Sequence, residues 1–138
     1  MQIGPQSDVT PMIADYMENG FLDNIIDMFR HDSSLYELIG TLIQDERVRV
    51  RIGVTALMEE LKRLDPINMT CAQKNLLPLL FHTDAIVRGD AANLIGIIGH
   101  KESLPFLERC LSDVHENVRL IAREAIDQMQ IHAKVHSK

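Results

Sequence analysis

The chain has 138 residues, of which 46% are hydrophobic and only 4% aromatic, and its formal net charge is −6. A chain of this length is the size of one domain, whose core must be filled mainly by Leu, Ile, Val and Met. No apolar run approaches the roughly 20 residues of a membrane-spanning helix, and a duplex-binding protein should show a basic face. We therefore expect neither a membrane nor a nucleic acid as partner.

The compartment is indicated by the first residues and by the cysteines. The start of the chain, MQIGPQSDVTP, lacks the basic and apolar regions of a secretory signal. Cys71 and Cys110 are too few for a disulfide framework, so reduced core thiols are expected. A cytoplasmic location follows as the default prediction.

Residues 1–32 predict two short helices that differ in pattern from the rest of the chain. Thr10-Pro11 suits a helix start, with the helix reaching about Gly20. A second amphipathic stretch follows and ends near His31-Asp32. Residues 1–31 carry five acidic side chains against Arg30 alone. We expect this segment to be an N-terminal helical cap, with a swapped or docking arm as the alternative.

Residues 33–130 repeat one apolar pattern about three times, beginning with a possible capping box at Ser34 and Glu37. All 21 positions of a template at relative positions 0, 3, 4, 11, 15, 18 and 19 are apolar. They are Ile39, Leu42, Ile43, Val50, Val54, Leu57, Met58, then Leu76, Leu79, Leu80, Val87, Ala91, Leu94, Ile95, and then Leu107, Cys110, Leu111, Val118, Ala122, Ala125, Ile126. Each repeat is predicted to be a helix pair that cannot bury its apolar stripe alone, so neighbouring pairs must stack.

Turn residues separate the helices of this array. Asp65-Pro66 ends a long helix, and residues 62–70 are predicted to form the longest connection. Pro78 predicts a kink or a late helix start, while Gly96 and Gly99 suit a turn that needs positive φ. The apolar pattern fades after Met129, so residues 131–138 are expected to form a frayed C-terminal tail.

The run VRGDAANLIGIIGHKESLPFLERCLSD, followed by ENVRLIAREAI, resembles the HEAT-like repeats of the phycobilisome-lyase type. The shared features are a Val-Arg pair opening the second helix, small residues behind it, a Gly-containing turn and a Leu-Pro start to the next helix. The resemblance implies an all-α fold, a short right-handed α-solenoid of stacked helix pairs. It also implies a protein-binding scaffold most often, although enzymes use the same repeat.

An arginine follows the template valine in every repeat, and we interpret Arg51, Arg88 and Arg119 as a structural arginine row that pairs with acids of the turns. The HEAT-like hydroxylases carry His-Glu pairs directly after this position, and the present chain has none there. His132 and His136 have metal-compatible spacing but lack further ligands nearby. We expect no metal, no cofactor and no catalytic residues.

One face of the second helices is the predicted partner-binding surface. In the resembled family this face is concave, and small residues of the middle repeat would form a trough between larger neighbours. Asn93 would anchor a bound segment, Ile52 and Leu120 would form apolar edges, and charged residues would form the rim. The alternative is that neighbouring helices of this chain already fill the trough. The predicted surface comprises Ile52, Glu59, Gly89, Ala92, Asn93, Gly96, Leu120, Arg123 and Glu124.

The sequence therefore predicts a non-catalytic protein-protein interaction scaffold or adaptor with a protein partner of unknown identity. The alternative is a HEAT-like enzyme subunit such as a bilin chromophore lyase. A homodimer formed through exposed solenoid ends is also open.

Overall fold

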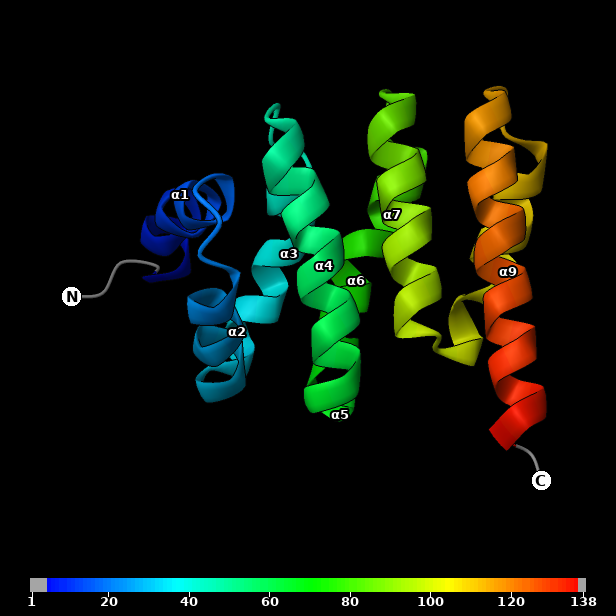
Figure 1. Cartoon of the computed structure of the whole chain (residues 1–138). Helices are drawn as coiled ribbons and strands as arrows, with labels where there is room; N and C mark the ends of the chain where they lie inside the picture. The colour runs from blue at the N-terminus through cyan, green and yellow to red at the C-terminus, as the bar shows by residue number, and fades with distance from the viewer. Residues whose placement is uncertain (1–4, 137–138) are drawn as a thin grey trace. The chain divides into compact units, whose positions relative to one another are not determined.

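Helices and turns make up the residues that the structure describes, 5–136, and no strand occurs among them (Figure 1). In this computed structural model, side chains are described from residue 9 to residue 131. The chain divides into two compact units, residues 1–75 (unit 1) and 76–138 (unit 2). The all-α fold expected from the sequence is confirmed.

Unit 1 is organised around α4 (Val48–Leu64), on which α1 (Pro5–Glu18) and α2 (Leu22–His31) pack. A Cβ atom at Gly53 of α4 would collide with the side chain of Met17 of α1, so this glycine permits their close approach. The remaining elements, with η denoting a 3₁₀ helix, are η1 (Ser33–Leu38), α3 (Ile39–Leu42), α5 (Pro66–Met69), η2 (Thr70–Ala72) and α6 (Gln73–Leu76), which ends on the first residue of unit 2.

The core of unit 1 joins its N-terminal helices to the first repeat. The rings of Phe29 and Tyr36, both fully buried, meet edge to face with centroids 5.2 Å apart. The hydroxyl of Tyr36 donates a hydrogen bond of 2.8 Å to Asp65, which follows the last residue of α4 as the sequence predicts. Burial and this hydrogen bond raise the pKa of Tyr36 above its usual range. The phenol therefore stays neutral and acts as a donor across the core.

Two local predictions for unit 1 are wrong, and a third is refined. The first helix begins at Pro5, upstream of the predicted start at Thr10-Pro11, so Pro11 lies in its interior. Asp32, rather than Ser34, caps the next element, because its carboxylate accepts from the backbone N–H of Ser34 at 3.1 Å. The predicted connection of residues 62–70 contains the end of α4 and all of α5, so it is largely helical. At α5 the backbone N–H of Met69 donates to the carbonyl of Asp65 at 3.1 Å, which closes a helical turn that the apolar pattern does not reveal.

In unit 2, α7 (Ala85–Ile98) and α9 (Glu116–His136) lie side by side, and α8 (Leu104–Arg109) packs on α9 (Figure 1). None of the helices among residues 5–136 is both long and apolar enough to cross a membrane. The α9 helix continues to His136, beyond the Met129 at which the pattern fades, so helicity outlasts the apolar stripe. The short elements are η3 (Leu77–Phe81), η4 (Lys101–Ser103) and η5 (Cys110–Ser112).

The predicted turns of unit 2 are partly confirmed. Gly99 has φ +71° and ends α7 in the left-handed region, as expected of a glycine at that place. Pro78 stands in the first turn of η3, where the preceding α-turn gives way to a 3₁₀ helix. Gly96, in contrast, lies inside α7 and has no turn role.

The repeat template describes the core closely. Nineteen of its 21 positions are buried, and the other two, Leu79 and Leu111, are half-buried. Such agreement follows because residues at these spacings share one helical stripe, and a stripe that is apolar in every helix pair is removed from water when the pairs pack.

Three turns of unit 2 are closed by histidine side chains. The Nδ1 atoms of His82, His100 and His115 accept from the backbone N–H two residues ahead, at 3.0, 3.2 and 3.2 Å. An imidazole accepts at Nδ1 only in the tautomer that carries its hydrogen on Nε2. The three histidine side chains therefore serve as hydrogen-bond acceptors in the turns that precede α7, η4 and α9.

Candidate interaction surface

The predicted trough does not form at its three smallest residues. Gly89, Ala92 and Gly96 are buried on one stripe of α7 that faces α9. A Cβ atom at Gly89 would lie 3.0 Å from Cδ1 of Ile121, and one at Gly96 would lie 2.5 Å from Cβ of Ala125. The small residues allow close packing of α7 on α9, which is the alternative that the sequence left open. They are therefore unavailable as a docking surface.

The other predicted binding residues are accessible. Ile52 and Glu59 are exposed on α4 of unit 1, with 63% of Ile52 accessible. On α9 of unit 2 the side chain of Leu120 is 55% exposed. Arg123 and Glu124 of the same helix are exposed, and Asn93 of α7 is half-buried.

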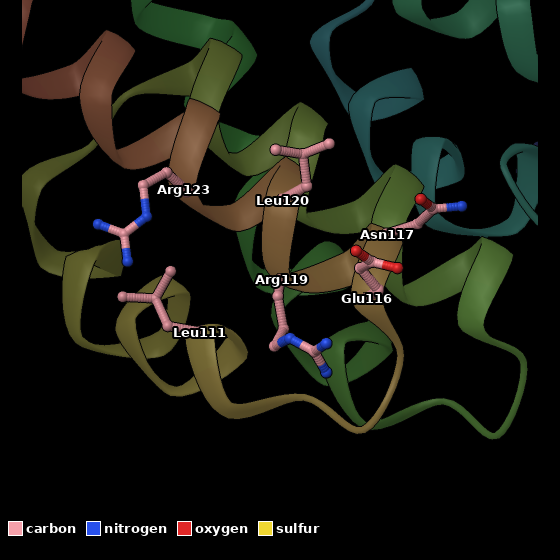
Figure 2. A pocket seen from close by; sticks show the side chains of 6 residues that line it. All are labelled: Leu111, Glu116, Asn117, Arg119, Leu120 and Arg123. Atoms are coloured by element: carbon pink, nitrogen blue, oxygen red, sulfur yellow. The ribbon is translucent and has the colours of Figure 1, made fainter.

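A surface hollow of about 590 Å³ lies in unit 2 beside the first turns of α9. Figure 2 shows that Leu120 and the two arginines come from α9, while Leu111 reaches the hollow from η5 beside Arg123. The full lining is Leu111, Glu116, Asn117, Arg119, Leu120 and Arg123. The sequence predicts Leu120 and Arg123 at the surface and Leu111 in the core. The sequence contains no sign that Leu111 would remain half-exposed, because its template position is apolar in every repeat.

The arginine row binds the turns that precede the second helices. Arg51 donates to the carbonyl oxygens of Asp45 and Glu46 at 3.1 and 3.3 Å. Arg119 donates to the carbonyl oxygen of Asp113 at 2.7 Å. The middle arginine, Arg88, similarly binds the carbonyls of His82 and Thr83, at 2.9 and 3.2 Å. Each guanidinium thus satisfies backbone acceptors that a tight turn leaves outside any helix.

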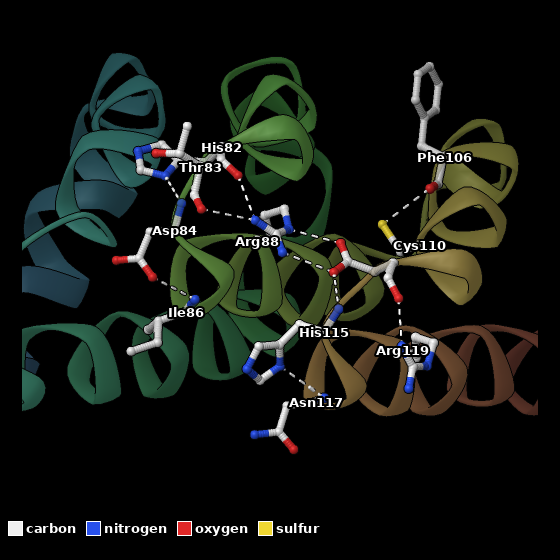
Figure 3. A network of polar contacts seen from close by, with 11 residues as sticks. His82, Thr83, Asp84, Ile86, Arg88, Phe106, Cys110, His115, Asn117 and Arg119 are labelled. Carbon is white, nitrogen blue, oxygen red and sulfur yellow. Dashed lines mark hydrogen bonds and ion pairs between the residues drawn. The ribbon is translucent and has the colours of Figure 1, made fainter.

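Arg88 also forms a two-pronged ion pair with Asp113, which comes from the following turn (Figure 3). Its Nε and Nη2 atoms lie 2.8 and 2.9 Å from the two carboxylate oxygens. The two side chains are 13% and 11% exposed, so the pair is largely shielded from water. Asp113 additionally accepts from the backbone N–H of His115 at 2.9 Å. The hydrogen bonds from Arg88 lower the pKa of Asp113, and the network ties successive turns of unit 2 together.

Acidification is expected to destabilise the wild-type protein more steeply than the Asp113→Asn variant. The pKa of Asp113 in the folded protein lies below its unfolded value of about 3.9. The contribution of Asp113 to the free energy of unfolding is therefore complete above about pH 3.9. The contribution is then lost as the pH falls from about 4 toward the folded pKa. Urea unfolding between pH 7 and pH 3 would measure this difference. Parallel pH profiles for the two proteins would show that the ion pair does not stabilise the fold.

The described side chains, residues 9–131, contain no cluster of three or more His, Cys, Asp or Glu residues able to hold a metal ion. His132 and His136 lie outside these side chains. Both cysteines are free, but only Cys110 is a core thiol, because Cys71 is exposed. Burial raises the pKa of Cys110, which keeps the thiol protonated and a poor nucleophile.

Residues 37–127 match a family model described as HEAT repeats. No curated protein matches the chain. The family match covers more than half of the 138 residues and includes the template positions from Ile39 to Ile126. With its stacked helix pairs, its arginine-closed turns and this match, the chain belongs to the family of HEAT-repeat proteins.

Proposed function

We propose that the protein is a non-catalytic interaction scaffold whose protein partner docks on the exposed face of a second helix. HEAT repeats commonly serve as protein-interaction scaffolds, because stacked helix pairs present one row of helices as a binding face. The observation that supports the proposal best is the 63% exposure of Ile52 on α4, a helix whose opposite face lies in the core.

The exposed face of α4 has the composition of a small interface. Val48 is 56% exposed and lies one helical turn before Ile52, so the two form a short apolar stripe. Glu59 and Arg63 continue the same face as exposed charged residues. An apolar centre bordered by charges is the usual anatomy of a docking surface.

Unit 2 offers a second face of this kind on α9. Leu120 supplies the apolar side chain there, and Arg123 and Glu124 supply charges of both signs. Gly89, Ala92 and Gly96 are no longer part of the proposed surface, because α9 covers them. The proposed partner contacts are thus Ile52 and Glu59 in unit 1, and Leu120 and Glu124 in unit 2.

The absence of catalysis is part of the proposal and is supported by how the reactive groups are occupied. The Cys110 thiol is buried, and Arg88 and Arg119 are bound to turn carbonyls. Two free cysteines also fit the reducing cytoplasm, where we place the protein. The bilin chromophore lyase alternative and the phycobilisome-lyase type of repeat stay predictions from the resemblance.

Ile52→Glu is expected to weaken partner binding at least about tenfold, because burying an isoleucine in an interface contributes more than about 1.4 kcal/mol. Affinity capture from the native lysate with quantitative mass spectrometry would measure the loss. Ile67→Glu is the matched control, since Ile67 is 83% exposed on α5 and lies outside the proposed face. Unchanged circular dichroism would show that both variants fold. Equal capture of the same partner by both variants would refute the α4 face.

A further inference from the structure

Two pairs of like charges stand on exposed helix faces, one in each unit. Arg119 and Arg123 are exposed on α9, and Asp23 and Asp27 are exposed on α2. Both pairs have i, i+4 spacing, which places like charges next to each other along a helix and is unfavourable for an isolated helix. A surface that supplies the opposite charges at the same spacing would relieve this repulsion in both helices.

The arginine pair borders the hollow of unit 2. Arg119 is held in place by its hydrogen bond of 2.7 Å to the Asp113 carbonyl, and Arg123 forms no ion pair among the described residues. Leu111 and Leu120 provide apolar surface in the same hollow. Of the charged residues in its lining, only Glu116 is acidic, so positive charge is in excess. The hollow therefore suits a ligand with two carboxylates and an apolar side chain.

The chain itself carries a surface of this chemistry at the start of α2. Phe21 directly precedes α2 and is 52% exposed, although its ring meets Tyr16 edge to face at 5.7 Å. Asp23 and Asp27 follow on the exposed side of α2, and Arg30 is the basic residue nearest to them in this helix. Residues 1–31 contain five acidic side chains against that single arginine.

We propose that the hollow on α9 binds the α2 surface of a second copy of this chain. Asp23 and Asp27 of one copy pair with Arg119 and Arg123 of the next, and Phe21 contacts Leu111 and Leu120 of the hollow. The contact joins two different surfaces, so it produces head-to-tail association rather than a two-fold dimer. It goes beyond the scaffold function and does not depend on the α4 face, although on α9 a second copy and a protein partner would compete for Leu120.

The association is expected to be weak and sensitive to salt. Exposed ion pairs contribute little individually, so we expect a dissociation constant on the order of 0.1–1 mM at low ionic strength. At 0.5 M salt the screening length falls to about 4 Å, and the protein is expected to become monomeric.

Sedimentation equilibrium of the full chain up to millimolar concentration tests the contact. The wild type is expected to associate at 50 mM NaCl, whereas Arg119→Glu/Arg123→Glu and Asp23→Lys/Asp27→Lys should each stay monomeric alone. Mixing the two variants should restore association, because the first retains the acidic surface and the second retains the basic hollow. The control Lys101→Glu/Arg109→Glu makes the same change of charge on exposed residues of unit 2 outside the hollow.

Three results would overturn the proposal. One is a wild type that stays monomeric at low salt over the whole concentration range. Another is self-association of the Arg119→Glu/Arg123→Glu variant to the wild-type extent, which would place any contact elsewhere. The third is loss of association in the control variant as well, which would attribute the effect to net charge. Partner capture by Ile52→Glu is a separate measurement, so failure of one proposal is distinguishable from failure of the other.

Discussion

Gly96→Val is expected to destabilise unit 2 by about 3 kcal/mol, at the upper end of the usual effect of overpacking a core. At this position of α7 even a methyl carbon would lie 2.5 Å from Cβ and 3.0 Å from Cα of Ala125 in α9. These atoms belong to or adjoin the backbone and cannot move aside without separating the two helices. Urea unfolding followed by circular dichroism would measure the loss of stability.

A reciprocal exchange tests whether the contact with Ala125 is the cause. Gly96→Ala should gain about 1 kcal/mol of helix propensity yet still destabilise the protein, because the close approach of the helices is lost. Adding Ala125→Gly moves the methyl group from one helix to the other and should recover about 1 kcal/mol relative to the sum of the single changes. Additive effects of the two substitutions would show that the residues do not oppose each other.

Arg88→Ala is expected to lower the free energy of unfolding, measured by urea denaturation, by about 2 kcal/mol. The substitution removes both hydrogen bonds to Asp113 and the donors to the carbonyls of His82 and Thr83. With only 11% of its side chain exposed, Asp113 then loses its cationic partner where water compensates poorly. Arg88→Lys should recover part of the loss, because an ammonium keeps the charge but cannot reproduce the two-pronged geometry.

The matched control for this prediction is Arg63→Ala. Arg63 and Glu60 form an ion pair of 2.8 Å, but the side chains are 68% and 38% exposed. Such a pair is expected to contribute less than about 0.5 kcal/mol. If the two alanine substitutions cost the same, burial of the Arg88–Asp113 pair would have no energetic consequence, and the network would be a surface feature.

The residues of these predictions differ in how far the sequence reveals them. The template stripe could be read directly, since apolar residues at helical spacing in each repeat have no favourable place except the core. Nineteen of the 21 template positions are buried, and helices end at Asp65-Pro66 and Gly99, as the sequence predicts. The local sequence alone therefore determines these features. The repeated Val-Arg pairs likewise predict a structural role for the three arginines, but they do not reveal which carbonyl groups accept their hydrogen bonds.

Tertiary structure decided what each face of a helix meets. A glycine or alanine is compatible with an open trough and with a tightly packed neighbour, and only the position of α9 shows that Gly89 and Gly96 serve packing. The partner of Arg88 was equally open, because Asp84 and Asp113 both lie in turns and the stacking of helix pairs selects Asp113. The apolar period determines which side of a helix turns inward, whereas contacts between residues distant in sequence depend on how the helices are placed in space.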